Sequence, residues 1–449
     1  MKENQFDVFV IGSGIAGQTV AKACAEAGLK VAIADKREFG GTCANRGCDP
    51  KKVLLGMTEV LESSKNLHGK GIAKLPKINW KKLQKFKKEF TSAVPKSTET
   101  DLKGMGIKLY HQSPKFLTED SLMVEGKKIT AKTIVIATGY EPRRLSFKGN
   151  GHLLTSDDFL NLKKLPKHIT FLGAGYVGME FAHMAVRAGA RVTVVESGQS
   201  PLNAFDGDLV KELTKYSKKL GIEFVFGAKT TAVKKLRKNL KLKYDINGTS
   251  RSLKSRAIFN TAGRVPASAE LDLEKGNVIF SDSGIGTNAF LQSKSNPKVY
   301  ACGDVSVNGL PLTPLSGREG NVVSENILKG NSKKISIPVI PSVVFTLPNM
   351  ASVGYSEEEA KSRYKSVLVK RASVPNWFNA KRINAPLYSY KIILNERTQE
   401  IVGAHLLGPE AGETVNIFAM AINAKMTADA LQGTIFTYPS WGNDLKSMV

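Results

Sequence analysis

Two glycine-rich segments constrain the fold of this 449-residue chain more than any other feature. Each follows a short apolar run, opens a helical stretch and leads to a second apolar run that ends in an acid, 23 positions after the first glycine. The glycines are Gly12, Gly14 and Gly17 in one segment and Gly173, Gly175 and Gly178 in the other, with acids Asp35 and Glu196. Two such β–α–β units predict an α/β protein with parallel, doubly wound sheets.

The spacing also predicts two dinucleotide sites. The first glycine permits a tight turn, the second lets a pyrophosphate approach the backbone, and the third lets helix and strand pack closely. The acid then accepts hydrogen bonds from ribose hydroxyls. Glu196 favours NADH over NADPH, because a carboxylate repels a 2′-phosphate and residues 197–200 include no Arg or Lys. NADPH stays open if Arg191 or a later lysine folds back to the phosphate.

The four cysteines are too few for a disulfide scaffold, and their spacing matches no metal site. Cys43 and Cys48 lie five residues apart, which in a regular helix separates their Cα atoms by about 8.6 Å. A disulfide bridges at most about 7 Å, so it would require a distorted turn, to which Gly47 and Pro50 are suited. Geometry alone leaves a redox disulfide and two unrelated thiols both open. Cys24 and Cys302 are expected to pack in the interior.

The chain carries 65 Lys and Arg against 40 Asp and Glu, a net charge of +25. Basic residues are densest in 74–88 and 234–243, and either attract anionic partners or form a solvated surface. No aromatic interleaving or recognition motif predicts a specific nucleic-acid partner. Without an apolar run of about 18 residues or a signal-peptide pattern, the sequence predicts a cytoplasmic protein with no membrane partner.

The segment GGTCANRGCDPKK (40–52) closely resembles the redox-disulfide motif of the class I pyridine nucleotide–disulfide oxidoreductases, the family of dihydrolipoamide dehydrogenase, glutathione reductase and mercuric reductase. Other motifs of that family follow in the same order over essentially the whole chain. They are IVIATGYEPR (134–143), GAGYVGMEFA (173–182), NTAGRVP (260–266), VYACGDV (299–305), LTPLSGREG (312–320), PSVVFTLPNMASVG (341–354) and IVGAHLLGPEAGE (401–413). The resemblance implies a homodimeric, FAD-dependent flavoenzyme that acts on sulfur groups in cell redox homeostasis.

The resemblance also implies roles for individual residues. The FAD site would comprise Gly12, Gly14, Gly17, Asp35, Gly41, Thr42, Thr138, Gly139, Gly303 and Asp304. The nicotinamide nucleotide site would comprise Gly173, Gly175, Tyr176, Gly178, Glu196 and Gly263, with Tyr176 as a gate over the flavin. Lys51 and Glu180 would pair beside the flavin. Cys48 would exchange electrons with the flavin, and Cys43 would attack the substrate.

Four domains follow from the same resemblance. Residues 1–148 would bind FAD, with a helical insertion at 51–102, and residues 149–268 would bind NAD(P). Residues 269–335 would complete the FAD site, and residues 336–449 would form an α+β dimerisation domain.

The C-terminal tail departs from the family, which has His-Pro-Thr-x-x-Glu there. Tyr438 replaces the histidine and Asn443 the glutamate, while Asp444 lies one residue out of register. A phenol loses its proton only near pH 10, so Tyr438 is a hydrogen-bond donor rather than a base. Three functions stay open: reduction of a small disulfide, a diaphorase that reduces quinones or metal ions without the disulfide, and a non-catalytic flavin-binding subunit.

Overall fold

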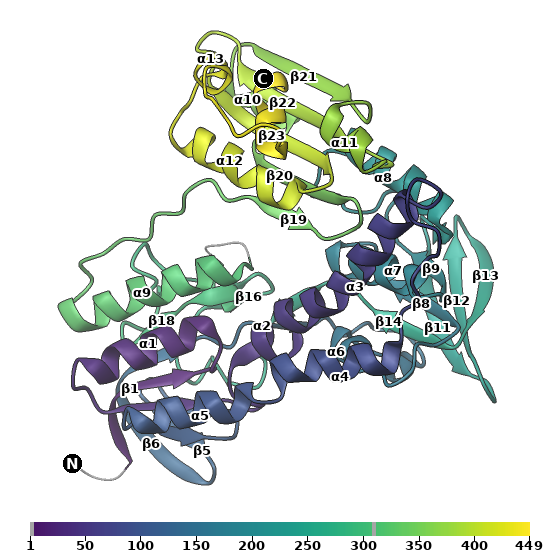
Figure 1. Ribbon diagram of the computed structural model, residues 1–449. Coiled ribbons are helices and arrows are strands. Elements are labelled where there is room, and N and C mark those ends of the chain that lie inside the picture. Colours follow the sequence, from purple (N-terminus) through teal and green to yellow (C-terminus); the bar gives the residue numbers. More distant parts are fainter. Residues whose placement is uncertain (1–3, 308–310) are drawn as a thin grey trace. The chain divides into compact units, whose positions relative to one another are not determined.

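The computed structural model describes residues 4–307 and 311–449, which form two compact units (Figure 1). The described residues of the first unit lie within 1–53, 85–143 and 263–337, and the second comprises 54–84, 144–262 and 338–449. Within the described part, no helix is both long and apolar enough to cross a membrane.

The first unit is built on a seven-stranded sheet in which the predicted strands at the first glycine segment are central. Its parallel strands lie in the order β3, β2, β1, β6, with β18 parallel to the last part of β6 and the antiparallel β5 and β4 beyond its beginning. The strands are β1 (Gln5–Ile11), β2 (Val31–Ala34), β3 (Lys108–Tyr110), β4 (Lys115–Thr118), β5 (Ser121–Val124), β6 (Lys127–Ile136) and β18 (Val299–Ala301). The sheet therefore joins residues near 136 to residues near 301.

Helices α1 (Ile15–Glu26) and α9 (Thr313–Lys329) pack against each other in this unit. A Cβ at Gly320 would lie 2.8 Å from the Ala16 carbonyl oxygen, so the glycine permits this close packing. The expected helical segment after the cysteines forms α3 (Cys48–Asn66), α4 (Trp80–Thr91) and α5 (Val94–Gly104), of which residues 54–84 belong to the second unit. Pro95 lies in the first turn of α5, just after the break that separates α5 from α4.

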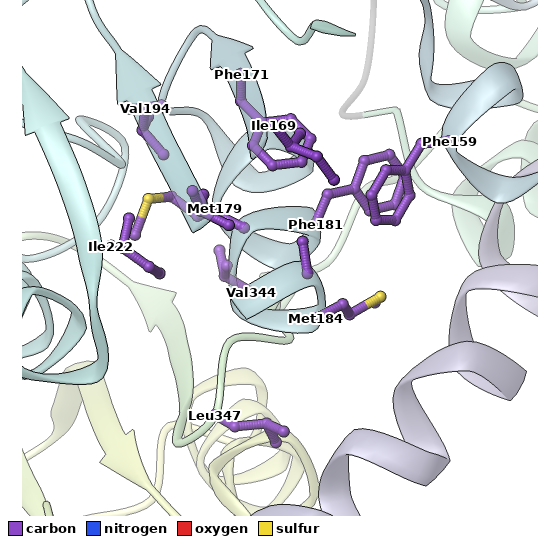
Figure 2. Packing of buried hydrophobic residues seen from close by; sticks show 14 of the residues in the cluster. Phe159, Ile169, Phe171, Met179, Phe181, Met184, Val194, Ile222, Val344 and Leu347 are labelled. Carbon is purple, nitrogen blue, oxygen red and sulfur yellow. The ribbon is translucent and has the colours of Figure 1, made fainter. Parts of the chain in front are cut away.

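The second glycine segment lies in a parallel sheet of the second unit with strand order β10, β9, β8, β14. These strands are β8 (His168–Leu172), β9 (Arg191–Val195), β10 (Ile222–Val225) and β14 (Ala257–Asn260), accompanied by α6 (Ser156–Leu160), α7 (Tyr176–Arg187) and α8 (Gly207–Leu220). Figure 2 shows the core between them, where Phe159 stacks on Phe181 with ring centroids 4.1 Å apart. A separate antiparallel sheet, β11 (Lys229–Lys235), β12 (Leu240–Ile246) and β13 (Thr249–Ser255), precedes β14.

The C-terminal part of the second unit is a five-stranded antiparallel sheet, as expected for an α+β domain. Its order is β19 (Ser342–Val344), β20 (Asn349–Gly354), β23 (Ile401–Gly408), β22 (Ser389–Asn395) and β21 (Val367–Ser373). Helix α12 (Ala411–Asn423) contacts β20 and β23. The shorter helices are α10 (Glu357–Arg363), α11 (Phe378–Arg382), α13 (Ala428–Gln432) and α14 (Trp441–Asp444). The predicted fold class of two dinucleotide-binding folds and a C-terminal α+β domain is therefore confirmed.

Candidate active site

Close backbone contacts require a glycine at four of the six positions, and Gly175 lies at an open one. Gly12 and Gly173 have φ of 108° and 105°, and a Cβ on either would collide with the backbone just after the neighbouring strand, β6 or β14. A Cβ at Gly17 would lie 1.9 Å from the Gly12 carbonyl oxygen, and one at Gly178 would lie 2.1 Å from that of Gly173. At Gly175, in contrast, a Cβ would meet no protein atom within 4 Å. The backbone is therefore open at the position where a pyrophosphate should approach.

Both acids of these segments hold the glycine loops in place. The Asp35 carboxylate accepts hydrogen bonds from the Ser13 N–H and hydroxyl at 2.8 and 2.7 Å. Glu196 accepts the Ala174 N–H at 2.7 Å and the Gly198 N–H at 2.7 Å. Each carboxylate follows the second strand of its β–α–β unit and thus holds the glycine turn that follows the first strand.

The residues expected at the FAD site form a cradle in the first unit. A Cβ at Gly41 would lie 2.4 Å from the Gly14 Cα, so the cysteine segment passes directly over the first glycine loop. The Thr138 hydroxyl oxygen is buried and has no hydrogen-bond partner among the residues that the structure describes. A buried polar group of this kind is normally paired, and FAD hydroxyls and phosphates would pair it. The donor set therefore fits FAD.

Gly303 and Asp304 complete this cradle through contacts with α9. Gly303 has φ of 73° and donates its N–H to the Glu319 carboxylate at 2.6 Å. The Asp304 carboxylate accepts the Ser316 hydroxyl at 3.3 Å. Burial raises the pKa of both acids, that of Glu319 to about 7. Glu319 is 2% exposed and was not singled out from the sequence, although it lies in the family motif at 312–320.

A break in the helix at Gly47 brings the two cysteines together. Helix α2 (Gly41–Arg46) ends there, and α3 begins at Cys48 after Gly47 adopts φ −135° and ψ −115°. A Cβ at Gly47 would lie 2.8 Å from the Thr42 carbonyl oxygen and 3.1 Å from the Cys43 Cα. The distorted turn predicted from the five-residue spacing is therefore present. Pro50 lies in the first turn of α3, which tolerates proline.

The Cys43 and Cys48 thiols are free in the structure, and each shifts the pKa of the other. The Cys43 thiol, with further support from the Lys51 charge, lowers the pKa of Cys48 to about 6. The same pairing, together with burial, raises the pKa of Cys43. The negative charge of the singly deprotonated pair is therefore held mainly on Cys48.

Thr313, the first residue of α9, also contacts this pair. Its Oγ1 lies 3.9 Å from the Cys48 Sγ, and its hydroxyl lowers the pKa of both thiols. The sequence did not single it out, because it lies 265 positions from Cys48. Its position in the family motif at 312–320 was the sequence signal that could have identified it.

The other expected site residues belong to different units. Lys51 and Gly263 lie in the first unit, whereas Tyr176 and Glu180 lie on α7 of the second. Glu180 is 1% exposed and accepts the Phe345 N–H at 2.9 Å, and Tyr176 is exposed. The Lys51–Glu180 pair, the gating role of Tyr176 and the nucleotide contact of Gly263 stay predictions.

In the C-terminal tail, hydrogen bonds from the α+β domain hold the side chain of Asp444. Its carboxylate accepts hydrogen bonds from the Asn379 side chain at 3.1 Å and from the Tyr388 hydroxyl at 3.1 Å. The Asn379 amide also donates to the Ser440 carbonyl at 2.9 Å. Tyr438 is 72% exposed. Asp444 therefore anchors the tail to the α+β domain.

Comparison with known proteins identifies the family. Residues 6–320 match the pyridine nucleotide-disulphide oxidoreductase model, and residues 340–449 match the dimerisation domain of the same family. The chain belongs to the pyridine nucleotide-disulphide oxidoreductases. It is accordingly an FAD-dependent flavoenzyme of disulfide oxidoreduction, as the sequence predicted.

Individual relatives cover nearly the whole chain. A glutathione reductase of Burkholderia cepacia is 29% identical over 100% of this chain and 99% of its own length. A dihydrolipoyl dehydrogenase of Staphylococcus aureus is 30% identical over 97% of this chain and 94% of its own. Among solved structures, the HOCl-induced flavoprotein disulfide reductase RclA from Escherichia coli is similar, with a TM-score of 0.87, 26% identity and coverage of 98% and 99%. A Cu(II) complex of RclA is also known, with the same TM-score and identity.

The glycine geometry makes a prediction about the second nucleotide site. Gly178→Ala forces a Cβ against the Gly173 carbonyl, so we expect a loss of about 1–3 kcal/mol in stability and a lower Tm. Gly175→Ala adds the same methyl group where no protein atom lies within 4 Å, so we expect an unchanged Tm but weaker NADH or NADPH binding. Thermal unfolding and nucleotide titration measure the two effects. Unchanged nucleotide affinity in Gly175→Ala would contradict the assignment.

The thiol pair makes a prediction about pH. The Cys48 thiolate is populated above its lowered pKa and lost below it, so alkylation of the reduced protein by iodoacetamide should rise through an inflection near pH 6. Thr313→Val should shift this inflection upwards, because the hydroxyl stabilises the thiolate. Thr249→Val, at an exposed position on β13, serves as the control. An inflection near pH 8.5, as for a free cysteine, would show that the pair is not coupled as described.

Proposed function

We propose that this enzyme transfers electrons from NADH or NADPH through FAD to Cys43 and Cys48, and from them to a small disulfide substrate. The observation that carries the proposal is the thiol pair at the Gly47 break, with its charge held on Cys48. The overall reaction adds a hydride and one solvent proton to the substrate disulfide and yields two thiols. Bound FAD supplies the two-electron relay between the nucleotide and the cysteines.

The residues have separate roles in this proposal. The first glycine loop, Gly41, Thr42, Thr138, Gly139, Gly303 and Asp304 bind FAD, and the second glycine loop binds the nicotinamide nucleotide. Cys43 attacks the substrate as a thiolate and forms a mixed disulfide. Its proton passes to the Cys48 thiolate, the neighbouring base. Cys48 gives this proton to the first substrate thiolate, which the attack of Cys43 has expelled. The Cys48 thiolate then attacks Cys43 in the mixed disulfide, which closes the Cys43–Cys48 disulfide and releases the second substrate thiolate to take up a solvent proton.

We further propose a homodimer in which Tyr438 is presented to the partner and orients the substrate sulfur as a hydrogen-bond donor. The matched dimerisation domain supports this arrangement. So do the exposed side chains of Phe378, Met420, Ile435 and Tyr438, since apolar surface of this kind is normally covered. A fully active monomer in sedimentation would contradict the dimer.

A second candidate is reduction of a metal ion. It is favoured by the similarity to RclA, which is known as a Cu(II) complex, and by a tail without the His–Glu pair. Among the residues that the structure describes, no group of three His, Cys, Asp or Glu side chains could hold a metal ion.

Replacement of the attacking thiol distinguishes these functions. Cys43→Ser should lower turnover of disulfide substrates by about a thousandfold or more, because no thiolate remains to attack, while NAD(P)H still reduces the flavin. Stopped-flow absorbance and steady-state assays with oxidised glutathione, lipoamide, quinones and Cu(II) measure the two steps. Undiminished turnover of the best acceptor in Cys43→Ser would identify a diaphorase instead.

Two further variants serve as controls for this experiment. Cys24→Ala changes a buried cysteine in the interior and should leave both steps unchanged. Tyr438→Phe should slow disulfide turnover without changing flavin reduction. If neither step changes in Tyr438→Phe, the tyrosine has no role in substrate orientation.

The nucleotide preference has its own test. Because the Glu196 carboxylate is fixed by two backbone N–H groups, it would meet a 2′-phosphate as a like charge, and we expect kcat/KM to be about tenfold or more higher for NADH than for NADPH. Glu196→Gln should narrow this ratio by improving NADPH use. Glu223→Gln, on the adjacent β10, is the matched control. A preference for NADPH in the native enzyme would overturn this assignment.

A further inference from the structure

One face of the antiparallel sheet of β11, β12 and β13, which Figure 1 shows, carries buried apolar side chains. Leu242 and Val233 lie directly opposite each other on it and are 0% and 4% exposed. They pack with Leu172 and Ile258 of the nucleotide-binding sheet. Since side chains alternate along a strand, the neighbours of these residues point to the other side of the sheet.

That other side is a row of lysines. Lys241 of β12 lies directly opposite Lys234 of β11 on one side and Lys254 of β13 on the other. The three lysines therefore form a row across the three strands. Lys243 follows two residues after Lys241 on the same face, and Lys229 lies on that face of β11. We call these five residues the lysine face. Arg237 and Lys238, in the turn between β11 and β12, add exposed charge beside the row.

Little on the sheet neutralises this charge. The one carboxylate at these face positions is Asp245, which lies opposite Lys229 and accepts the Gly248 N–H at 2.8 Å. Within the part of the chain that the structure describes, the row of Lys234, Lys241 and Lys254 forms no ion pair. Like charges directly opposite each other destabilise a sheet, so the lysine row lowers the stability of the protein. Binding of an anionic partner would neutralise this repulsion and raise the stability again.

The spacing of the row matches a polyanion. Neighbouring strands lie about 4.8 Å apart and alternate residues of one strand about 6.7 Å apart, so the ammonium groups form a flat array that long side chains can adjust. The face positions carry no aromatic side chain on which unpaired bases could stack and no large apolar side chain that could enter a lipid interface. These features favour phosphates of a stacked duplex.

We propose that the lysine face binds the phosphate backbone of double-stranded nucleic acid without reading its sequence. The contact needs no recognition motif, which agrees with the absence of one in the chain. It is independent of the thiol chemistry, so this proposal stands whichever electron acceptor the enzyme uses.

Salt dependence of duplex binding tests the proposal. The FAD-loaded enzyme should bind a fluorescent 20-base-pair DNA of arbitrary sequence at about 50 mM salt, with affinity falling steeply as salt increases. Changing Lys234→Gln, Lys241→Gln and Lys254→Gln together removes about three phosphate contacts. The slope of log K against log salt should then become shallower by about 2.7, and affinity at about 50 mM salt should fall about tenfold or more. Disulfide turnover should be unchanged, and Tm unchanged or higher.

A second triple variant separates the lysine face from net charge. Lys163→Gln, Lys164→Gln and Lys167→Gln remove the same charge from an exposed segment of the same unit, and should leave the slope nearly unchanged. Equal losses in the two triple variants, or no duplex binding by the native enzyme, would overturn the proposal. So would tighter binding to phosphatidylglycerol vesicles or to a polyglutamate peptide than to the duplex, if it depends on the same three lysines.

Discussion

The close approach of backbone to backbone at the glycines is the constraint on which the site in the first unit depends. Gly17 meets the Gly12 carbonyl, which fixes the start of α1 against the end of β1. Gly41 meets Gly14, which fixes the start of α2 on that same loop. Gly47 then meets Thr42 and sets where α3 begins. The position of Cys48 is thus determined through successive contacts that no side chain larger than hydrogen permits.

The same contacts explain the charge of the thiol pair. Once the helix breaks at Gly47, the Cys43 thiol is placed to stabilise the Cys48 thiolate, and Lys51 lies one turn further along α3. A thiolate held by a neighbouring thiol needs no histidine to form near neutral pH. The absence of a histidine in the tail therefore does not prevent the thiolate from forming, although the family motif has a histidine there. What the tail cannot supply is a second proton relay for the leaving thiol.

Much of this site could be predicted from the sequence, because its determinants are local. The glycine spacing, the two acids and the five-residue cysteine spacing each impose geometry within a short segment. Thr313 and Glu319 could not be found in this way, because each contacts a residue outside its own helix: Cys48 and Gly303, respectively. These contacts depend on the pairing of β18 with β6, which precedes α9 in the chain. The lysine row was equally hidden. The sequence shows lysines between 234 and 243, but Lys254 joins them only through the register of β12 with β13.

The tail shows why a carboxylate one residue out of register is not a substitute. On α14 a shift of one residue turns a side chain by about 100° around the helix axis. Asp444 therefore lies on the side that meets Asn379 and Tyr388, where two hydrogen bonds hold it. To orient a group at Tyr438 it would have to give up both bonds and leave two buried donors unpaired, at a cost of about 1–3 kcal/mol for each. The carboxylate thus stabilises the α+β domain and does not replace the glutamate of the family tail.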